Sequence, residues 1–171
     1  MQVVYRGTNQ KLLDASGFVN DLADNADFWA EIAARPRFDF SRSTGAQVAQ
    51  AMRGKQTAIV LREYRPPWPR HRHTNAYTDP AYPDTLFYNS KKLWRSVPSM
   101  INTIVHEFVH LADFAATDAD FGHGDQGSEG KENSAPWWIG ALAERYYLAE
   151  VSAAPQIERI TIDPAAIVGD E

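Results

Sequence analysis

The spacing of apolar residues changes from helical to strand-like along the first third of the chain. Residues 12–34 carry apolar side chains mostly three and four positions apart, which predicts one or two helices that end before Pro36. Residues 37–40 have an extended pattern, and a short helix is predicted over 45–53, with Gly54 placed to end it. We therefore expect this part of the chain to mix α and β structure.

The central third contains two predicted strands separated by a long connection. Residues 57–64 are rich in β-branched and aromatic side chains, and residues 85–89 form the second strand candidate. Between them, residues 65–84 contain five prolines, which exclude a continuous helix and predict a surface loop. Within this loop, residues 65–73 are locally basic and aromatic. We interpret them as a solvated loop, with contact to a phosphate or a substrate as the alternative.

Two long helices are predicted in the last third. The first begins near Pro98, where a proline fits the first helical turn, and continues to about Ala115 with a broad apolar side. A connection rich in glycine and aspartate follows over residues 117–133. The second helix is expected over residues 134–151, and residues 152–171 are expected to form a tail.

The composition is typical of one globular domain built from these elements. The chain has 171 residues, of which 44% are hydrophobic and 23% are charged. We expect a compact α+β fold over residues 1–171, in which a small mixed sheet packs on the helix over 97–115 and a further C-terminal helix completes the core.

The charge balance and the lack of cysteine exclude several classes of function. Acidic residues outnumber basic ones by 22 to 17, so nucleic acid is not an expected partner. Without cysteine there is no disulfide scaffold and no thiolate metal site, so a metal ion would have to be held by His, Asp or Glu. No segment resembles a secretory signal or a membrane span, so we expect the cytoplasm, or export by a leaderless route, as the location.

The helix predicted over 97–115 contains an H-E-x-x-H motif at His106, Glu107 and His110. Four residues correspond to about 400° of helical rotation, so both imidazoles project from nearly one face and can meet one zinc ion. Glu107 lies one step around the helix, beside the ion, where a carboxylate can act as general base toward water. The alternative is two surface histidines on an amphipathic helix with an incidental glutamate.

A catalytic zinc site needs a third protein ligand, and His123 is the best candidate. It is the only remaining histidine after the helix, and Gly122 and Gly124 beside it permit a tight backbone turn toward the ion. Imidazole is also a preferred ligand of zinc. The alternative is that His123 is an ordinary loop residue.

Two carboxylates remain as alternatives for the third ligand. Glu144 would supply it from the last helix, as in thermolysin-like sites, and Asp120 loosely matches the aspzincin pattern. The metzincin class is excluded, because positions 113 and 116 would need to be Gly and His and are Asp113 and Ala116.

Other polar and aromatic residues are candidates for supporting roles. Asp113 lies seven residues after the first histidine, on the same face of the helix, and either orients a ligand or is a surface carboxylate. The last helix carries a cluster of four aromatic residues that is typical of core packing, although a tyrosine hydroxyl there is a candidate to stabilise an oxyanion. The members of this cluster are Trp137, Trp138, Tyr146 and Tyr147.

The motif at 106–110 and the later His123-Gly124 pair resemble the SprT-like zinc metallopeptidases, whose domain uses an H-E-x-x-H helix and a downstream His-Gly. The resemblance covers less than a quarter of the chain. It implies a compact zincin in which the three histidines bind zinc and Glu107 is the catalytic base. Two features depart from the family's pattern: no cysteine is present for a zinc ribbon, and residues 125–133 form a Gly-rich loop. We therefore carry over the site and not the DNA-linked role of that family.

These observations lead to a functional hypothesis with two alternatives. We expect a zinc-dependent metallopeptidase, most simply an endopeptidase, that acts on a peptide or protein. Residues 85–89, just before the motif helix, resemble the edge strand on which zincins bind an extended peptide. The alternatives are an exported toxin or effector metallopeptidase, and a non-catalytic binding module that a metal ion stabilises.

Overall fold

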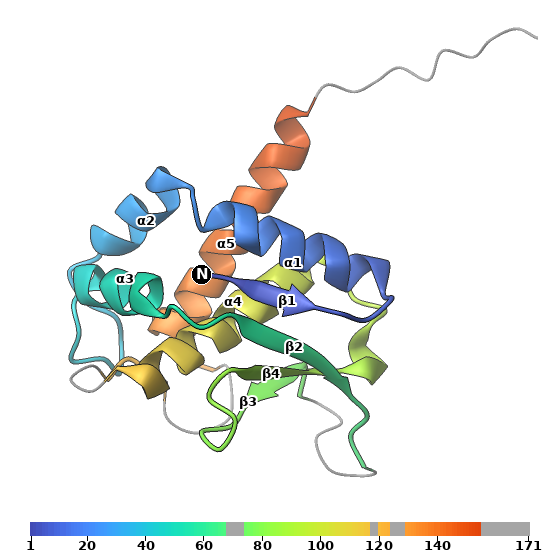
Figure 1. Ribbon diagram of the computed structural model, residues 1–171. Coiled ribbons are helices and arrows are strands. Elements are labelled where there is room, and N and C mark those ends of the chain that lie inside the picture. The colour runs from blue at the N-terminus through green and yellow to red at the C-terminus, as the bar shows by residue number, and fades with distance from the viewer. Residues whose placement is uncertain (68–73, 117–119, 124–128, 155–171) are drawn as a thin grey trace, which may run out of the picture.

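A four-stranded mixed sheet forms one layer of the protein (Figure 1). The computed structural model describes residues 1–67, 74–116, 120–123 and 129–154. The sheet has the strand order β1-β2-β4-β3. Strands β1, β2 and β4 are parallel to one another, and β3 pairs antiparallel with β4, at one edge of the sheet. The strand bounds are β1 Val3–Tyr5, β2 Ile59–Tyr64, β3 Ala76–Thr78 and β4 Thr85–Asn89.

Five α-helices accompany the sheet within the described part of the chain, so the α+β fold class is confirmed. The pattern over 12–34 folds as two helices, each preceded by an asparagine. The side chains of Asn9 and Asn25 accept hydrogen bonds from the backbone N–H groups of Leu12 and Phe28. The bounds are α1 Gln10–Leu22, α2 Ala26–Ala33, α3 Gly45–Gly54, α4 Val97–Ala115 and α5 Ala135–Ala153, and a 3₁₀ helix, η1, spans Ser90–Lys92.

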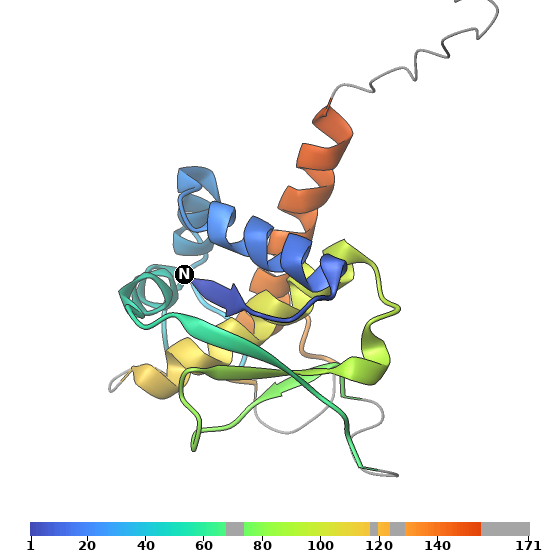
Figure 2. The same cartoon turned by 45° about the vertical axis from the view of Figure 1, so that its right-hand side comes forward.

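The long helix α4 lies at the centre of the core. Figures 1 and 2 show it running behind the sheet, with α1 and α5 on the same side. Leu61 of β2 pairs with Leu86 of β4, and both are buried against this helical layer. Because side chains alternate between the two faces of a strand, the neighbouring pair Arg62 and Phe87 lies on the opposite face. One continuous hydrophobic core therefore joins the sheet to the helices.

Helices α4 and α5 approach each other closely at Gly140. A Cβ atom at this position would lie 2.8 Å from the carbonyl oxygen of Asn102 on α4, so only glycine allows this approach without a shift. One turn later, Asn102 Nδ2 donates a hydrogen bond of 2.8 Å to Glu144 Oε2. The two contacts fix the position of α5 on α4.

Two strands of the sheet were missed by the sequence pattern. β1 and β3 have only three residues each, which is too short for an alternating pattern to be detected. β3 lies inside residues 65–84, the predicted surface loop, and is formed by pairing Ala76 with Tyr88 and Thr78 with Leu86. β4 therefore has a neighbour on each side, and the prediction that residues 85–89 form an edge strand is wrong.

The chain turns at residues 38–41, so the extended segment predicted over 37–40 is interrupted at Phe40. The backbone N–H of Ser41 donates a hydrogen bond of 3.3 Å to the carbonyl oxygen of Phe38. Phe40 has a φ of 61°, in the left-handed region that a bulky residue rarely adopts. Only Asp39 makes a strand-like bridge, which pairs it with Ser134 at the start of α5.

The last predicted helix is confirmed and ends two residues later than expected, because α5 continues to Ala153. The remainder of the predicted tail, residues 155–171, lies outside the described residues, as do residues 68–73 of the basic loop. In the part of the chain that the structure describes, no helix combines the length and the hydropathy needed to cross a membrane.

Candidate metal centre

Helix α4 supplies the first three residues of the site from a mostly buried position. His106 and Glu107 are 8% and 9% exposed, and His110 is half-buried. The residues around them on α4 are apolar and face the core, so the helix cannot turn its polar motif toward bulk water without exposing that apolar surface. The predicted placement of the H-E-x-x-H motif on a packed helix is therefore confirmed.

His123 completes a cluster with the two histidines of α4. Its Nε2 atom lies 3.0 Å from Nε2 of His110 and 3.2 Å from Nε2 of His106. Three imidazoles that each bind one ion at 2.0–2.1 Å in tetrahedral geometry have nitrogens about 3.3 Å apart, which is close to these separations. His106, His110 and His123 thus lie close enough together to bind a metal ion.

Burial keeps the two helical histidines in the form that binds metals. It lowers the pKa of His106 to about 2, with a further contribution from His110 and His123, and lowers the pKa of His110 to about 4, with a further contribution from His123. Both imidazoles are therefore neutral near pH 7 and keep a nitrogen lone pair for a metal ion.

Glu107 follows His106 on α4, and its carboxyl contacts the edge strand of the sheet. Thr78 of β3 donates a hydrogen bond of 3.1 Å from Oγ1 to Glu107 Oε2. Burial raises the pKa of Glu107 to about 7, and the hydrogen bond from Thr78 opposes this rise. A carboxyl with a pKa near neutrality can both accept and return a proton at physiological pH.

Two aromatic rings flank the histidines. The ring of Trp137 on α5 meets His106 edge to face, with 4.6 Å between the ring centroids. Phe114 lies one turn after His110 on α4, with centroids 6.5 Å apart and planes inclined by 26°. Trp137 is partly buried and limits the access of water to His106, whereas Phe114 is 43% exposed.

The two alternative ligands lie outside the histidine cluster. Glu144 is engaged by Asn102, and the side chain of Asp120 is exposed. Neither carboxylate belongs to the group whose ligand atoms all lie within 4.8 Å of one another. Among the three predicted candidates, His123 is the one that the fold brings to the helical pair.

Two supporting predictions near His123 have different outcomes. Asp113 accepts a hydrogen bond of 2.9 Å from the backbone N–H of Phe121, so it contacts the segment that carries His123 and is not a bare surface carboxylate. Gly122 does not have a positive φ, and a Cβ atom there would make only an ordinary contact, 3.5 Å from Asp113 Oδ2. The backbone at position 122 therefore does not use the conformational freedom that the sequence analysis expected its glycine to permit. Gly124 lies outside the described residues.

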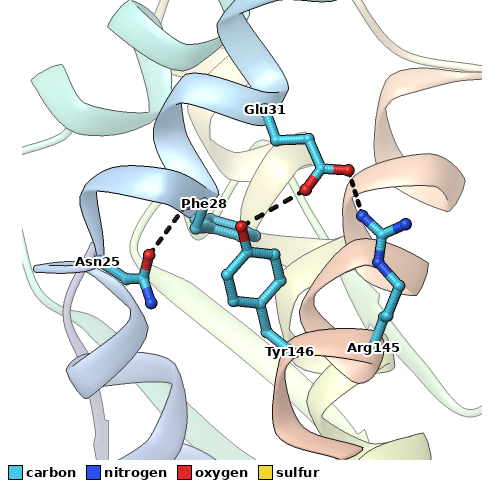
Figure 3. Close-up of polar contacts among 5 residues, drawn as sticks. All are labelled: Asn25, Phe28, Glu31, Arg145 and Tyr146. Carbon is cyan, nitrogen blue, oxygen red and sulfur yellow. Dashed lines mark hydrogen bonds and ion pairs between the residues drawn. The ribbon is translucent and has the colours of Figure 1, made fainter. Parts of the chain in front are cut away.

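The tyrosines of the last helix pack on other helices. Figure 3 shows Tyr146 and Arg145 of α5 directed toward Glu31 of α2, where the Tyr146 hydroxyl donates a hydrogen bond of 3.4 Å and Arg145 forms an ion pair. The Tyr146 ring also meets Phe28 edge to face at 5.7 Å, and Tyr147 meets Phe18 in the same way at 5.1 Å. These contacts agree with the packing role rather than with stabilisation of an oxyanion.

Three residues of the site were not found by sequence reasoning. Thr78 lies in what was predicted to be a loop, and no local pattern marks it as the partner of a glutamate 29 residues away. Trp137 was noted only as one member of an aromatic cluster, and Phe114 follows His110 at helical i+4 spacing, a signal that could have identified it.

Comparison with known proteins does not assign the chain to a family. No protein-family profile, no curated protein and no solved structure matches the chain.

Proposed function

We propose that the protein is a zinc-dependent metallopeptidase that acts as an endopeptidase. The observation that carries the proposal is the convergence of the Nε2 atoms of His106, His110 and His123. The buried Glu107 directly follows the first of these histidines on α4. Three imidazoles suit zinc, and three protein ligands are typical of catalytic zinc, whereas structural zinc sites have four. Within the described residues, the cluster consists of three histidines.

In this proposal the residues of the chain have distinct roles. Bound zinc supplies Lewis acidity that polarises a peptide carbonyl and acidifies water. Glu107 takes a proton from the attacking water and passes it to the leaving amine. Thr78 orients the carboxylate through its hydrogen bond, and Trp137 shields His106 from solvent.

The edge of the sheet offers a place for an extended peptide. β3 pairs with β4 on one side only, and its residue Thr78 already touches the general base. We propose that the substrate adds to β3 through main-chain hydrogen bonds, with the scissile bond near Glu107. β3 thus takes the role that the sequence pattern had suggested for residues 85–89.

The first experiment measures zinc content and peptide hydrolysis in parallel on the full chain. We expect about one zinc per chain in the wild-type protein, loss of zinc in His123→Ala, and retention of zinc with loss of hydrolysis in Glu107→Gln. Glu144→Gln is the matched control, because Glu144 contacts Asn102 and not the histidines, and it should keep zinc and activity.

Other results would exclude the proposal or point to one of its alternatives. A wild-type protein that binds no zinc would make the H-E-x-x-H match a coincidence. Zinc binding without hydrolysis of any peptide would favour the binding module, and hydrolysis limited to a host protein would favour the exported effector.

A further inference from the structure

His123, the third residue of the histidine cluster, does not belong to a helix. His106 and His110 are fixed relative to each other because both belong to α4. His123, in contrast, lies in residues 120–123, which are neither helix nor strand. Ordering an irregular segment costs conformational entropy, so the position of its imidazole depends on contacts that other residues supply.

The first contact comes from the turn between α2 and α3. Ser41 Oγ donates a hydrogen bond of 3.0 Å to the carbonyl oxygen of Asp120, and the backbone N–H of Arg42 donates to the same oxygen at 3.1 Å. Ser41 is only 2% exposed, and its hydroxyl accepts a further hydrogen bond of 2.9 Å from the Ser43 backbone. The Ser43 carbonyl oxygen lies 3.2 Å from the same hydroxyl, farther than the Asp120 oxygen, and in this buried setting a lost hydrogen bond is costly.

Phe40, which has a left-handed backbone conformation, belongs to the same turn between α2 and α3. It reverses the chain just before Ser41, in the turn that the hydrogen bond from Ser41 to Phe38 closes. A bulky residue in this conformation persists only where surrounding contacts enforce it, and such strain is concentrated at functional sites. The turn thus presents Ser41 and Arg42 to the segment that carries His123.

The second contact comes from the metal-binding helix itself. Asp113, three residues after His110 on α4, accepts a hydrogen bond of 2.9 Å at Oδ1 from the backbone N–H of Phe121. The Phe121 side chain is fully buried and anchors the same point. The helix that carries two ligands therefore also holds the backbone two residues before the third.

The same turn reaches the far end of the connection between α4 and α5. The backbone N–H of Asp39 donates a hydrogen bond of 3.1 Å to the carbonyl oxygen of Asn133, and Asp39 forms a bridge with Ser134. One short turn thus contacts the connection both before His123, at Asp120, and after it.

We propose that Ser41 and Asp113 are positioning residues that hold His123 in place for metal binding, so that the third ligand is ordered before the ion arrives. The inference rests on the proposed function in that it takes the three histidines as the metal ligands. A pre-ordered ligand binds more tightly because its ordering cost is met during folding and not during binding. Residues that orient a metal ligand without binding the metal themselves typically contribute 10- to 100-fold to metal affinity.

The test measures zinc affinity of the full chain by competition with a chromophoric chelator. Ser41→Ala and Asp113→Ala should each bind zinc about 10- to 100-fold more weakly than the wild-type protein. Asp113→Asn keeps an oxygen acceptor for Phe121 and should restore most of the affinity. Asp21→Ala, on the exposed surface of α1, is the control and should bind zinc as the wild-type protein does.

A second measurement separates positioning from a general loss of structure. Cobalt substituted into the site reports coordination through its visible absorption, so a displaced His123 should change the spectrum of the loaded variants while circular dichroism stays native. Ser41 and Asp113 belong to different elements, so either folded alanine variant decides the question. Wild-type zinc affinity and a wild-type cobalt spectrum in such a variant would overturn the proposal.

These measurements distinguish a failure of the positioning role from a failure of the proposed peptidase function. If His123→Ala loses zinc while Ser41→Ala and Asp113→Ala do not, the positioning role is wrong and the metal site stands. If the affinities follow our expectation but no peptide is hydrolysed, the positioning role stands and the peptidase assignment is wrong.

Discussion

At the residue scale, the ionisation of Glu107 couples the site to the stability of the fold. Burial raises the pKa of this carboxyl from 4.5 to about 7. Between these two pH values the folded protein keeps a proton that the unfolded chain has released, so unfolding becomes easier as the pH rises through this range. Glutamine at position 107 resembles the protonated carboxyl and cannot ionise, so it removes this pH dependence.

We therefore predict a pH-dependent gain in stability for Glu107→Gln in the metal-free protein. At pH 4.5 its free energy of unfolding should be close to that of the wild-type protein, and at pH 8 it should be higher by about 2–3 kcal/mol. Urea unfolding in the presence of a chelator at both pH values measures the difference. Glu150→Gln, on the exposed surface of α5, is the control and should show no such change. An equal difference at both pH values would contradict the prediction.

At the element scale, the site depends on how α5 packs against α4, because α5 carries Trp137 and α4 carries two ligands. The close approach at Gly140 sets this packing, since a Cβ atom would lie 2.8 Å from a backbone oxygen of α4. Gly17 in α1 provides a contrast, because a Cβ atom there would have no neighbour within 4 Å.

The two glycines should therefore respond in opposite ways to alanine. Gly140→Ala should lower the free energy of unfolding by about 1–3 kcal/mol, because the helices must move apart. Gly17→Ala should raise it by about 0.5–1 kcal/mol, because alanine restricts the unfolded chain and favours the helix. Chemical unfolding of both variants checks the pair. A neutral Gly140→Ala would show that the interface of the two helices adapts without cost.

At the scale of the whole molecule, the proposed metal site links segments that only folding brings together. His106 and His110 come from α4, whereas His123 comes from the connection beyond it. Zinc should therefore bind the folded state far more tightly than the unfolded chain, and binding should stabilise the fold.

We predict that zinc raises the melting temperature of the wild-type protein. At a free zinc concentration 100 times the Kd, the gain is about 2.7 kcal/mol, or about 5–10 °C for a chain of this size. Differential scanning calorimetry with zinc and with a chelator measures the shift. His123→Ala should lose most of the response, and a wild-type protein without any shift would show that zinc does not bind the native state.

Features that depend on neighbouring residues were predicted from the sequence, whereas features that depend on contacts between distant residues were not. The motif on α4 was found because helical periodicity is local, and α1 and α2 were found for the same reason. His123 was one of three candidates for its role, and the spacing of residues along the chain could not choose among them. β3 and the role of Thr78 were missed, because a three-residue strand exists only through its partner β4.

The sequence by itself determined the helices, the α+β class and the residues able to provide ligands, because apolar periodicity and side-chain chemistry are properties of neighbouring positions. Only the tertiary structure decided which candidate joins the two helical histidines, which strand lies at the edge beside Glu107, and that Ser41 and Asp113 hold the segment bearing His123. These are contacts between residues distant in sequence, and they depend on how the core orients α4, α5 and the sheet relative to one another.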